Sequence, residues 1–155
     1  MKKLQGKSKE EYIFMGSRAS ILLDGKSTDG RMSVVELTEF KGLEAPAHIH
    51  GNEDELIEVR EGQLTFYSNG EEQELFAGDT VHLPKGNAHY FKVHTDSARI
   101  RVVSTPAGFE TLIRNVGKPV SSETDMPSME TVHQQVGSLI AEGEKLGLKV
   151  LIPTK

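Results

Sequence analysis

The stretch "APAHIHGNEDELIEVREG", Ala45–Gly62, holds two histidines one residue apart, then an acidic cluster and an alternating apolar run. Side chains of a β-strand alternate between its two faces, so His48 and His50 point the same way if this segment is a strand. Pro46 favours an extended approach to the pair, and "GNED" (residues 51–54) is typical of a turn. Such a strand can direct two imidazoles at one metal ion.

The strand expected after this turn begins at Glu55. Glu55, Ile57 and Val59 share one parity and alternate with Glu58 and Arg60. This alternation places the Glu55 carboxylate at the end of a face whose other members belong to the core. A carboxylate in that position is costly unless it is paired or bound to a metal.

A further histidine-bearing strand follows the predicted hairpin "QLTFYSNGEEQELF" (Gln63–Phe76). Its Asn69–Gly70 dipeptide supplies the positive φ angles that a tight hairpin turn requires. In the later segment "AHYFKV", His89 shares its face with Phe91 and Val93. An imidazole on such an apolar face is expected to be buried, and it then needs a partner.

These segments supply three imidazoles and one carboxylate: His48, His50, His89 and Glu55. This set suits a first-row divalent metal and leaves room for water or substrate. Each component alone has an ordinary interpretation, as surface histidines, a hydrogen-bonded core histidine or solvated carboxylates, but their joint occurrence favours a metal site. The remaining carboxylates of the stretch are expected to be solvated: Glu53, Asp54, Glu58 and Glu61.

Composition narrows the class of protein. The 155 residues suit one domain with its own core. The net charge of −5 argues against a nucleic-acid partner, which would require clustered Lys and Arg. No apolar run approaches the roughly 20 residues of a membrane span, and no signal peptide is expected, because the basic start lacks an apolar segment after it. Cysteine is absent, so a metal would be held by His, Asp, Glu or water, and we expect a cytoplasmic protein.

The chain changes character after Pro106. Before it, from about residue 12 to 105, short β-branched and aromatic runs alternate with glycine-containing turns, which predicts an all-β sandwich or barrel. Beyond it, Ala107–Gly117 and Met129–Gly147 are predicted helices, followed by a short strand at "LKVLIP". We therefore expect a single domain, residues 1–155, with a barrel core at about 12–105 and a helical tail at about 107–150.

Two motifs in this sequence resemble those of the cupin superfamily. The first, G-x5-H-x-H-x3–4-E-x6-G, is met at every specified position of "GLEAPAHIHGNEDELIEVREG" (Gly42–Gly62). The second, G-x5-P-x-G-x2-H-x3-N, is met by "GDTVHLPKGNAHYFKV", except that Val93 replaces the final Asn. The flanks, such as "STPAGFETLI", look loosely like small single-domain bacterial cupins that resemble quercetin-dioxygenase-like proteins.

The resemblance implies a fold and a ligand set. The fold is the double-stranded β-helix, an all-β jelly-roll barrel, with a short C-terminal helical extension. The implied metal ligands are the four residues already reached from strand parity: His48, His50, Glu55 and His89. Small cupins commonly pair, which implies a homodimer formed through the N-terminal strand around residues 12–15 or the tail helix.

The resemblance also implies a chemistry. It suggests a metal-dependent dioxygenase acting with O₂ on a small phenolic or enolisable, flavonol-like compound, with Glu55 as both ligand and catalytic base. Nickel, manganese, iron, cobalt, copper and zinc all accept this ligand set. Two alternatives share the same residues: a non-catalytic cupin that binds a small molecule or metal as a sensor or store, and a metal-dependent isomerase. The polarity of the pocket would discriminate, because sugar sites need several inward polar groups.

An apolar pocket is expected around the ion. Phe91 and Val93 share the face of His89, and the helix in "PAGFETLI" follows the last barrel strand, where it can cap the mouth. The ordinary interpretation of each of these side chains is core packing. The expected pocket residues are Phe66, Phe91, Val93, Val103, Phe109 and Leu112.

Overall fold

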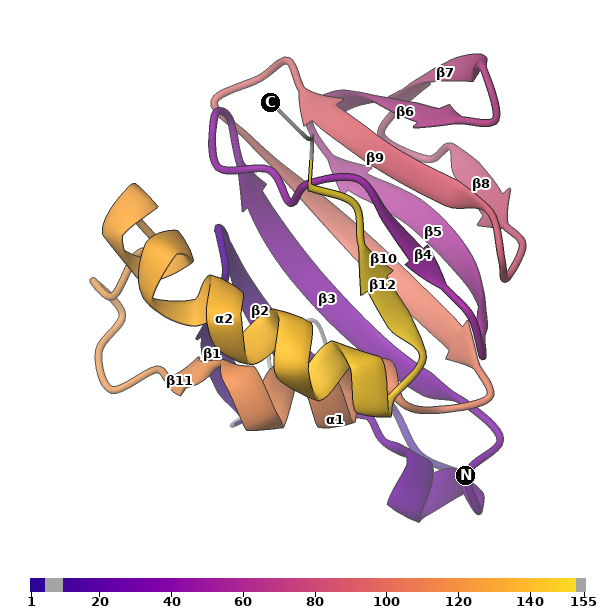
Figure 1. Ribbon diagram of the computed structural model, residues 1–155, viewed down its shortest axis with the longest axis vertical. Helices are drawn as coiled ribbons and strands as arrows, with labels where there is room; N and C mark the ends of the chain where they lie inside the picture. Colours follow the sequence, from indigo (N-terminus) through magenta and orange to yellow (C-terminus); the bar gives the residue numbers. More distant parts are fainter. Residues whose placement is uncertain (5–9, 153–155) are drawn as a thin grey trace.

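The computed structural model describes residues 1–4 and 10–152, which form two antiparallel sheets around one apolar core (Figure 1). The larger sheet has the order β11 (Lys118–Pro119), β1 (Glu11–Phe14), β2 (Ser17–Leu23), β3 (Ser33–Phe40), β10 (Ser97–Thr105), β5 (Asp54–Glu61) and β8 (Thr80–Leu83). The smaller sheet has the order β12 (Leu148–Val150), β4 (His48–His50), β9 (Ala88–Val93), β6 (Gln63–Ser68) and β7 (Glu71–Phe76). The helices are the 3-10 turn η1 (Gly25–Thr28), α1 (Phe109–Val116) and α2 (Met129–Lys145). This arrangement confirms the predicted all-β class.

The core follows from alternation along the strands of the larger sheet. On β10, every second side chain from Ala98 to Ser104 is buried. Ile100 lies between Leu37 of β3 and Val59 of β5 in the ladder, and all three are buried. Burying an aliphatic side chain of this size stabilises the fold by about 1.5–3 kcal/mol. The inner face of this sheet is therefore apolar along most of its length, and a polar side chain on it stands out.

The predicted hairpin forms as the sequence indicates. Strands β6 and β7 pair from Gln63↔Phe76 to Ser68↔Glu71. Asn69 and Gly70 join them with φ angles of 51° and 78°, both in the left-handed region that this tight turn needs. The turn fixes the register of β6, which carries Phe66 into the core.

The segment after Pro106 contributes to the sheets as well as to the helices. Helices α1 and α2 pack on each other, and Figure 1 shows them together beside β1 and β2. Ser128 caps α2, its hydroxyl accepting a hydrogen bond from the amide of Thr131 at 3.2 Å. The chain then returns as β12, which pairs with β4. The expected helical tail thus ends as an edge strand beside the histidine-bearing strand.

A buried glutamine connects α2 to the turn between β1 and β2. The side chain of Gln135 accepts a hydrogen bond from the amide of Met15 at 2.6 Å and donates one to the carbonyl of Ile13 at 3.0 Å. Met15 has a φ of 53°, which is unusual for a residue other than glycine. These two bonds therefore hold a strained turn in place.

In the described part of the chain, no helix is both long and apolar enough to cross a bilayer.

We predict that Gln135→Leu lowers the free energy of unfolding by about 1–3 kcal/mol, because it leaves a buried amide and a buried carbonyl without partners. Urea unfolding followed by circular dichroism measures this change. Gln134→Leu is the matched control on the exposed side of the same helix, and it should shift stability by less than about 0.5 kcal/mol. Equal midpoints for the two variants would contradict the proposed role of Gln135.

Candidate metal centre

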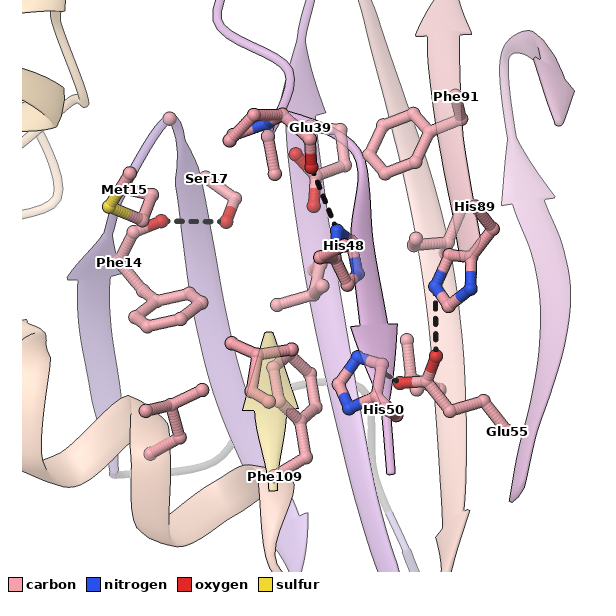
Figure 2. A pocket seen from close by; sticks show the side chains of 18 of the residues that line it. Phe14, Met15, Ser17, Glu39, His48, His50, Glu55, His89, Phe91 and Phe109 are labelled. Carbon is pink, nitrogen blue, oxygen red and sulfur yellow. Dashed lines mark hydrogen bonds and ion pairs between the residues drawn. The ribbon is translucent and has the colours of Figure 1, made fainter. Parts of the chain in front are cut away.

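Strand pairing brings the three histidines together inside the barrel. Strands β4 and β9 pair with His48 directly opposite His89, and His50 lies two residues further along the same face of β4. The ring centroid of His48 is 4.5 Å from that of His89 and 5.1 Å from that of His50. One ligand atom from each ring lies within 4.8 Å of the others. Figure 2 shows the three rings converging on a common space.

Hydrogen bonds orient each imidazole. The Nδ1 atoms lie 2.9 Å from the carbonyl oxygen of Pro46 for His48, 2.7 Å from a carboxylate oxygen of Glu53 for His50, and 3.2 Å from the carbonyl oxygen of Asn87 for His89. These oxygens can only accept, so each Nδ1 is assigned the proton. The Nε2 lone pairs then remain free to bind a metal, as in metal sites where an outer acceptor fixes the tautomer.

Glu55 stands beside the histidines from the other sheet. Its Oε1 lies 3.5 Å from Nε2 of His50, and its Oε2 lies 3.4 Å from Nε2 of His89. Ligands bound at about 2.0–2.2 Å to one ion lie roughly 3.0–3.5 Å apart for bond angles between 90° and 109°. The observed spacings match this range and exceed the usual hydrogen-bond length. The chemistry of the donor set therefore suits a divalent transition metal, with the three histidines as the grouped ligands and Glu55 beside two of them.

The electrostatics of the cluster favour a neutral His48, an ionised Glu55 and a more readily protonated His50. Burial, reinforced by the neighbouring His89 and His50, lowers the pKa of His48 to about 4. Burial acts to raise the pKa of Glu55, but the three imidazoles outweigh it and the pKa is lowered. Burial likewise acts to lower the pKa of His50, but the Glu55 and Glu53 carboxylates outweigh it and the pKa is raised. A metal ion bound here would displace any proton from His50, because ligation requires the neutral ring.

Glu53 differs from its expected place in solvent. The residue is 6% exposed, and its side chain accepts the hydrogen bond from His50 described above. The turn that carries it is held inward, because the amide of Gly51 donates to the carbonyl of Gly147 at 2.8 Å and Asn52 donates to the carbonyl of Leu146 at 3.1 Å. The i,i+3 spacing from His50 across a turn was the local signal for this contact.

The other three carboxylates of the stretch lie away from the cluster. Asp54 is on the far face of β5, where it accepts a hydrogen bond from the amide of Lys85 at 2.9 Å. Glu58 pairs with Arg60 at 2.8 Å, half-exposed, and Glu61 is exposed. These positions agree with the expectation of solvated side chains.

The histidine cluster faces a mostly apolar cavity. Four of the six expected pocket residues line it: Phe66, Phe91, Phe109 and Leu112. Val93 and Val103 are not among the lining residues. Val93 is packed in the core next to Leu64. Val103 has the opposite parity to the buried Val102, so it lies on the outer face of β10.

Several lining residues were not anticipated. They come from strands and helices distant in sequence, and no local motif marks them: Phe14, Met15, Ser17, Leu37, Glu39, Ile57, Ile100, Val102, Leu139 and Leu148. Alternation along β3 does mark Leu37 and Glu39 as sharing one face. What the sequence does not provide is the pairing of β3 with β10 that turns this face toward the histidines.

The remaining histidines lie outside the cluster. His82 is exposed, with Nε2 3.6 Å from a carboxylate oxygen of Asp54. His94 shares a 2.8 Å hydrogen bond with the hydroxyl of Thr65. His133 is exposed on α2.

Comparisons with known proteins agree with this architecture. Residues 37–106 match the sequence profile of the cupin domain. A quercetin 2,3-dioxygenase of Bacillus subtilis is 30% identical over 128 residues, which cover 83% of this chain and 37% of that protein. The chain therefore spans well under half the length of that relative.

Solved structures share the fold at low sequence identity. A predicted oxalate decarboxylase from Thermotoga maritima has a TM-score of 0.60 and 18% identity, covering 68% of this chain and 99% of that one. A nucleoside dehydratase has a TM-score of 0.58 and 17% identity, covering 84% and 96%. That enzyme comes from Streptomyces, and a variant of it has been solved with uridine.

These neighbours support the double-stranded β-helix as the fold, with a short helical part at the C-terminal end. The matched profile spans the strands that carry all three histidines and Glu55. Sequence profile, curated relative and solved folds agree in supporting a cupin superfamily protein, with the matched cupin domain at residues 37–106.

Proposed function

We propose that this cupin binds one divalent transition metal through His48, His50, His89 and Glu55 and acts as a dioxygenase on a small flavonol-like compound. The observation that carries the proposal is the three-histidine cluster, with Nε2 atoms free, at the wall of an apolar cavity. The similarity to a quercetin 2,3-dioxygenase supports the reaction class, although the chain spans only 37% of that protein.

Glu55, Phe91 and Phe109 would have separate roles in this reaction. A bound metal would act as a Lewis acid toward an enolic or phenolic oxygen. Glu55, ionised and buried beside His50 and His89, is placed to accept the proton of that hydroxyl. Phe91 and Phe109 would hold a flat aromatic ligand and exclude water, since both line the cavity and Phe109 packs edge-on against His50.

The cavity wall favours this reaction over the isomerase alternative. A sugar-like substrate needs several inward polar groups, whereas the lining is mostly aliphatic and aromatic apart from the metal cluster, Ser17 and Glu39. A non-catalytic binding role uses the same residues, and oxygen consumption distinguishes it from catalysis. The homodimer stays a prediction, and light scattering of the purified chain measures it.

The first prediction concerns the metal. His48→Ala combined with His50→Ala should reduce bound metal from about one per chain to near zero, because two of four ligands are lost. Elemental analysis after dialysis measures the stoichiometry. His82→Ala removes an exposed histidine and should bind as the wild type does. Full retention of metal by the double variant would show that the site is elsewhere.

The second prediction concerns the support of His50. Glu53→Gln should weaken metal binding by about 10–100-fold, because the partner that fixes the imidazole is lost as a carboxylate. Competition with a chelator gives the affinity. Glu58→Gln, which changes a half-exposed carboxylate on the next strand, is the matched control. If both variants bind metal equally well, Glu53 has no part in positioning His50.

The third prediction concerns the reaction. The metal-loaded protein should consume O₂ when supplied with flavonols, and Glu55→Gln should slow this by about 100-fold or more if the carboxylate is the base. An oxygen electrode, with each metal loaded in turn, measures the rate. Metal-loaded protein that binds flavonols but consumes no O₂ would favour the sensor or store.

A further inference from the structure

Glu39 is a second buried carboxyl group in the cavity, separate from the metal cluster. It lies on β3, is 5% exposed, and lines the same cavity as the histidines. Glu55 is level with Ser104 of β10, which in turn pairs with Ser33 of β3. Glu39 is six residues further along β3 than Ser33, so it lies at a different level of the barrel from Glu55. In Figure 2, Glu39 and Ser17 lie at the other end of the site from Glu55.

The carboxyl group of Glu39 has little to satisfy it within the described residues. Ser17 lies directly opposite it in the β2–β3 ladder. The Ser17 hydroxyl donates its one proton to the carbonyl of Phe14 at 2.8 Å. It therefore offers a lone pair toward Glu39, which suits a protonated carboxyl group. No Lys or Arg among the described residues forms a salt bridge with it.

The surroundings keep this group neutral near physiological pH. Burial, with the negative charge of Glu44 added, raises the pKa of Glu39 to about 8. Glu44 accepts hydrogen bonds from the amides of Gly42 at 2.9 Å and Val93 at 3.0 Å. The histidine strand adds His48 and His50 to the lining of this cavity, while Ala98, opposite Glu39 on β10, carries no charge.

We propose that Glu39 and Ser17 form a second polar anchor that binds a hydroxyl group at the end of the ligand remote from the metal. A buried carboxyl group that can both donate and accept, in an otherwise apolar wall, is costly unless a ligand completes its hydrogen bonds. The negative charge of Glu44, which acts on Glu39, also disfavours an anionic substituent there. The ligand class is thus an extended, mostly apolar polyphenol, with a metal-binding oxygen at one end and a neutral hydroxyl at the other.

This inference rests on the proposed function, because it assumes that the ligand's other end reaches the histidines. Its test compares two probes in metal-loaded protein without oxygen: 3-hydroxyflavone and 3,4′-dihydroxyflavone, which adds one hydroxyl on the remote ring. Calorimetry should show that the wild type binds the dihydroxy compound about tenfold more tightly, the usual effect of one well-placed hydrogen bond. Glu39→Leu should abolish this preference while still binding 3-hydroxyflavone.

Two further variants separate recognition from structure. Glu39→Gln keeps a group that donates and accepts at every pH, so its preference should persist from pH 6 to 9, whereas that of the wild type should fall above about pH 8. Glu72→Leu, an exposed site on β7, should leave the preference unchanged. Equal binding of both flavonols by the wild type overturns the anchor alone and leaves the metal-dependent function standing. Absence of binding by either flavonol overturns both.

A measurement without ligand or metal tests the protonation directly. A carboxyl group whose pKa is raised by folding stabilises the fold below its unfolded pKa, and this contribution is lost as pH rises through about 8. The melting temperature of the wild type should therefore fall relative to Glu39→Gln between pH 6 and 9. A difference that stays constant over this range would show that Glu39 is not held protonated, and would overturn the anchor.

Discussion

The pairing of β4 with β9 is the constraint on which the site depends. It sets His48 opposite His89 and leaves His50 on the same inward face. A slip of one residue would turn the β4 histidines to the outer face, since side chains alternate along a strand. Two hydrogen bonds fix the far end of β4: the amide of Gly86 donates to the carbonyl of His50 at 2.7 Å, and the amide of Gly51 donates to Gly147 at 2.8 Å.

This register places polar groups in a wall that otherwise excludes water, and each group is stabilised locally. The imidazole Nδ1 atoms have acceptors from Pro46, Glu53 and Asn87, while the Nε2 atoms and the Glu55 carboxylate face one another. The Nδ1 atoms on the outer side of the cluster thus all have hydrogen-bond acceptors. The Nε2 atoms and the Glu55 carboxylate on the inner side remain available to a ligand, as expected of a site that holds an ion.

The sequence was informative where chemistry and geometry are local. Parity within a strand and spacing across one turn are sufficient to group His48, His50 and Glu55, and the second motif adds His89. The burial of Glu53 was not predicted, because it depends on the hydrogen bond from Gly51 to the distant Gly147, which holds the turn inward. Val103 was placed in the pocket without reference to the parity of β10. The position of Glu39 in the cavity was not predicted, because it depends on which strand pairs with β3. Strand order in a barrel is not encoded in any single segment.

The two parts of the cavity come from different stretches of the chain. The segment matching the family profile, residues 37–106, contains the histidines and both inward glutamates. Much of the remaining lining lies outside it: Phe14, Met15, Ser17, Phe109, Leu112, Leu139, Leu148 and Val150. Substitutions in the flanking segments can therefore change the shape of the cavity without touching the strands that carry the histidines. The outline of the cavity and the make-up of the histidine cluster are thus set largely by different parts of the chain.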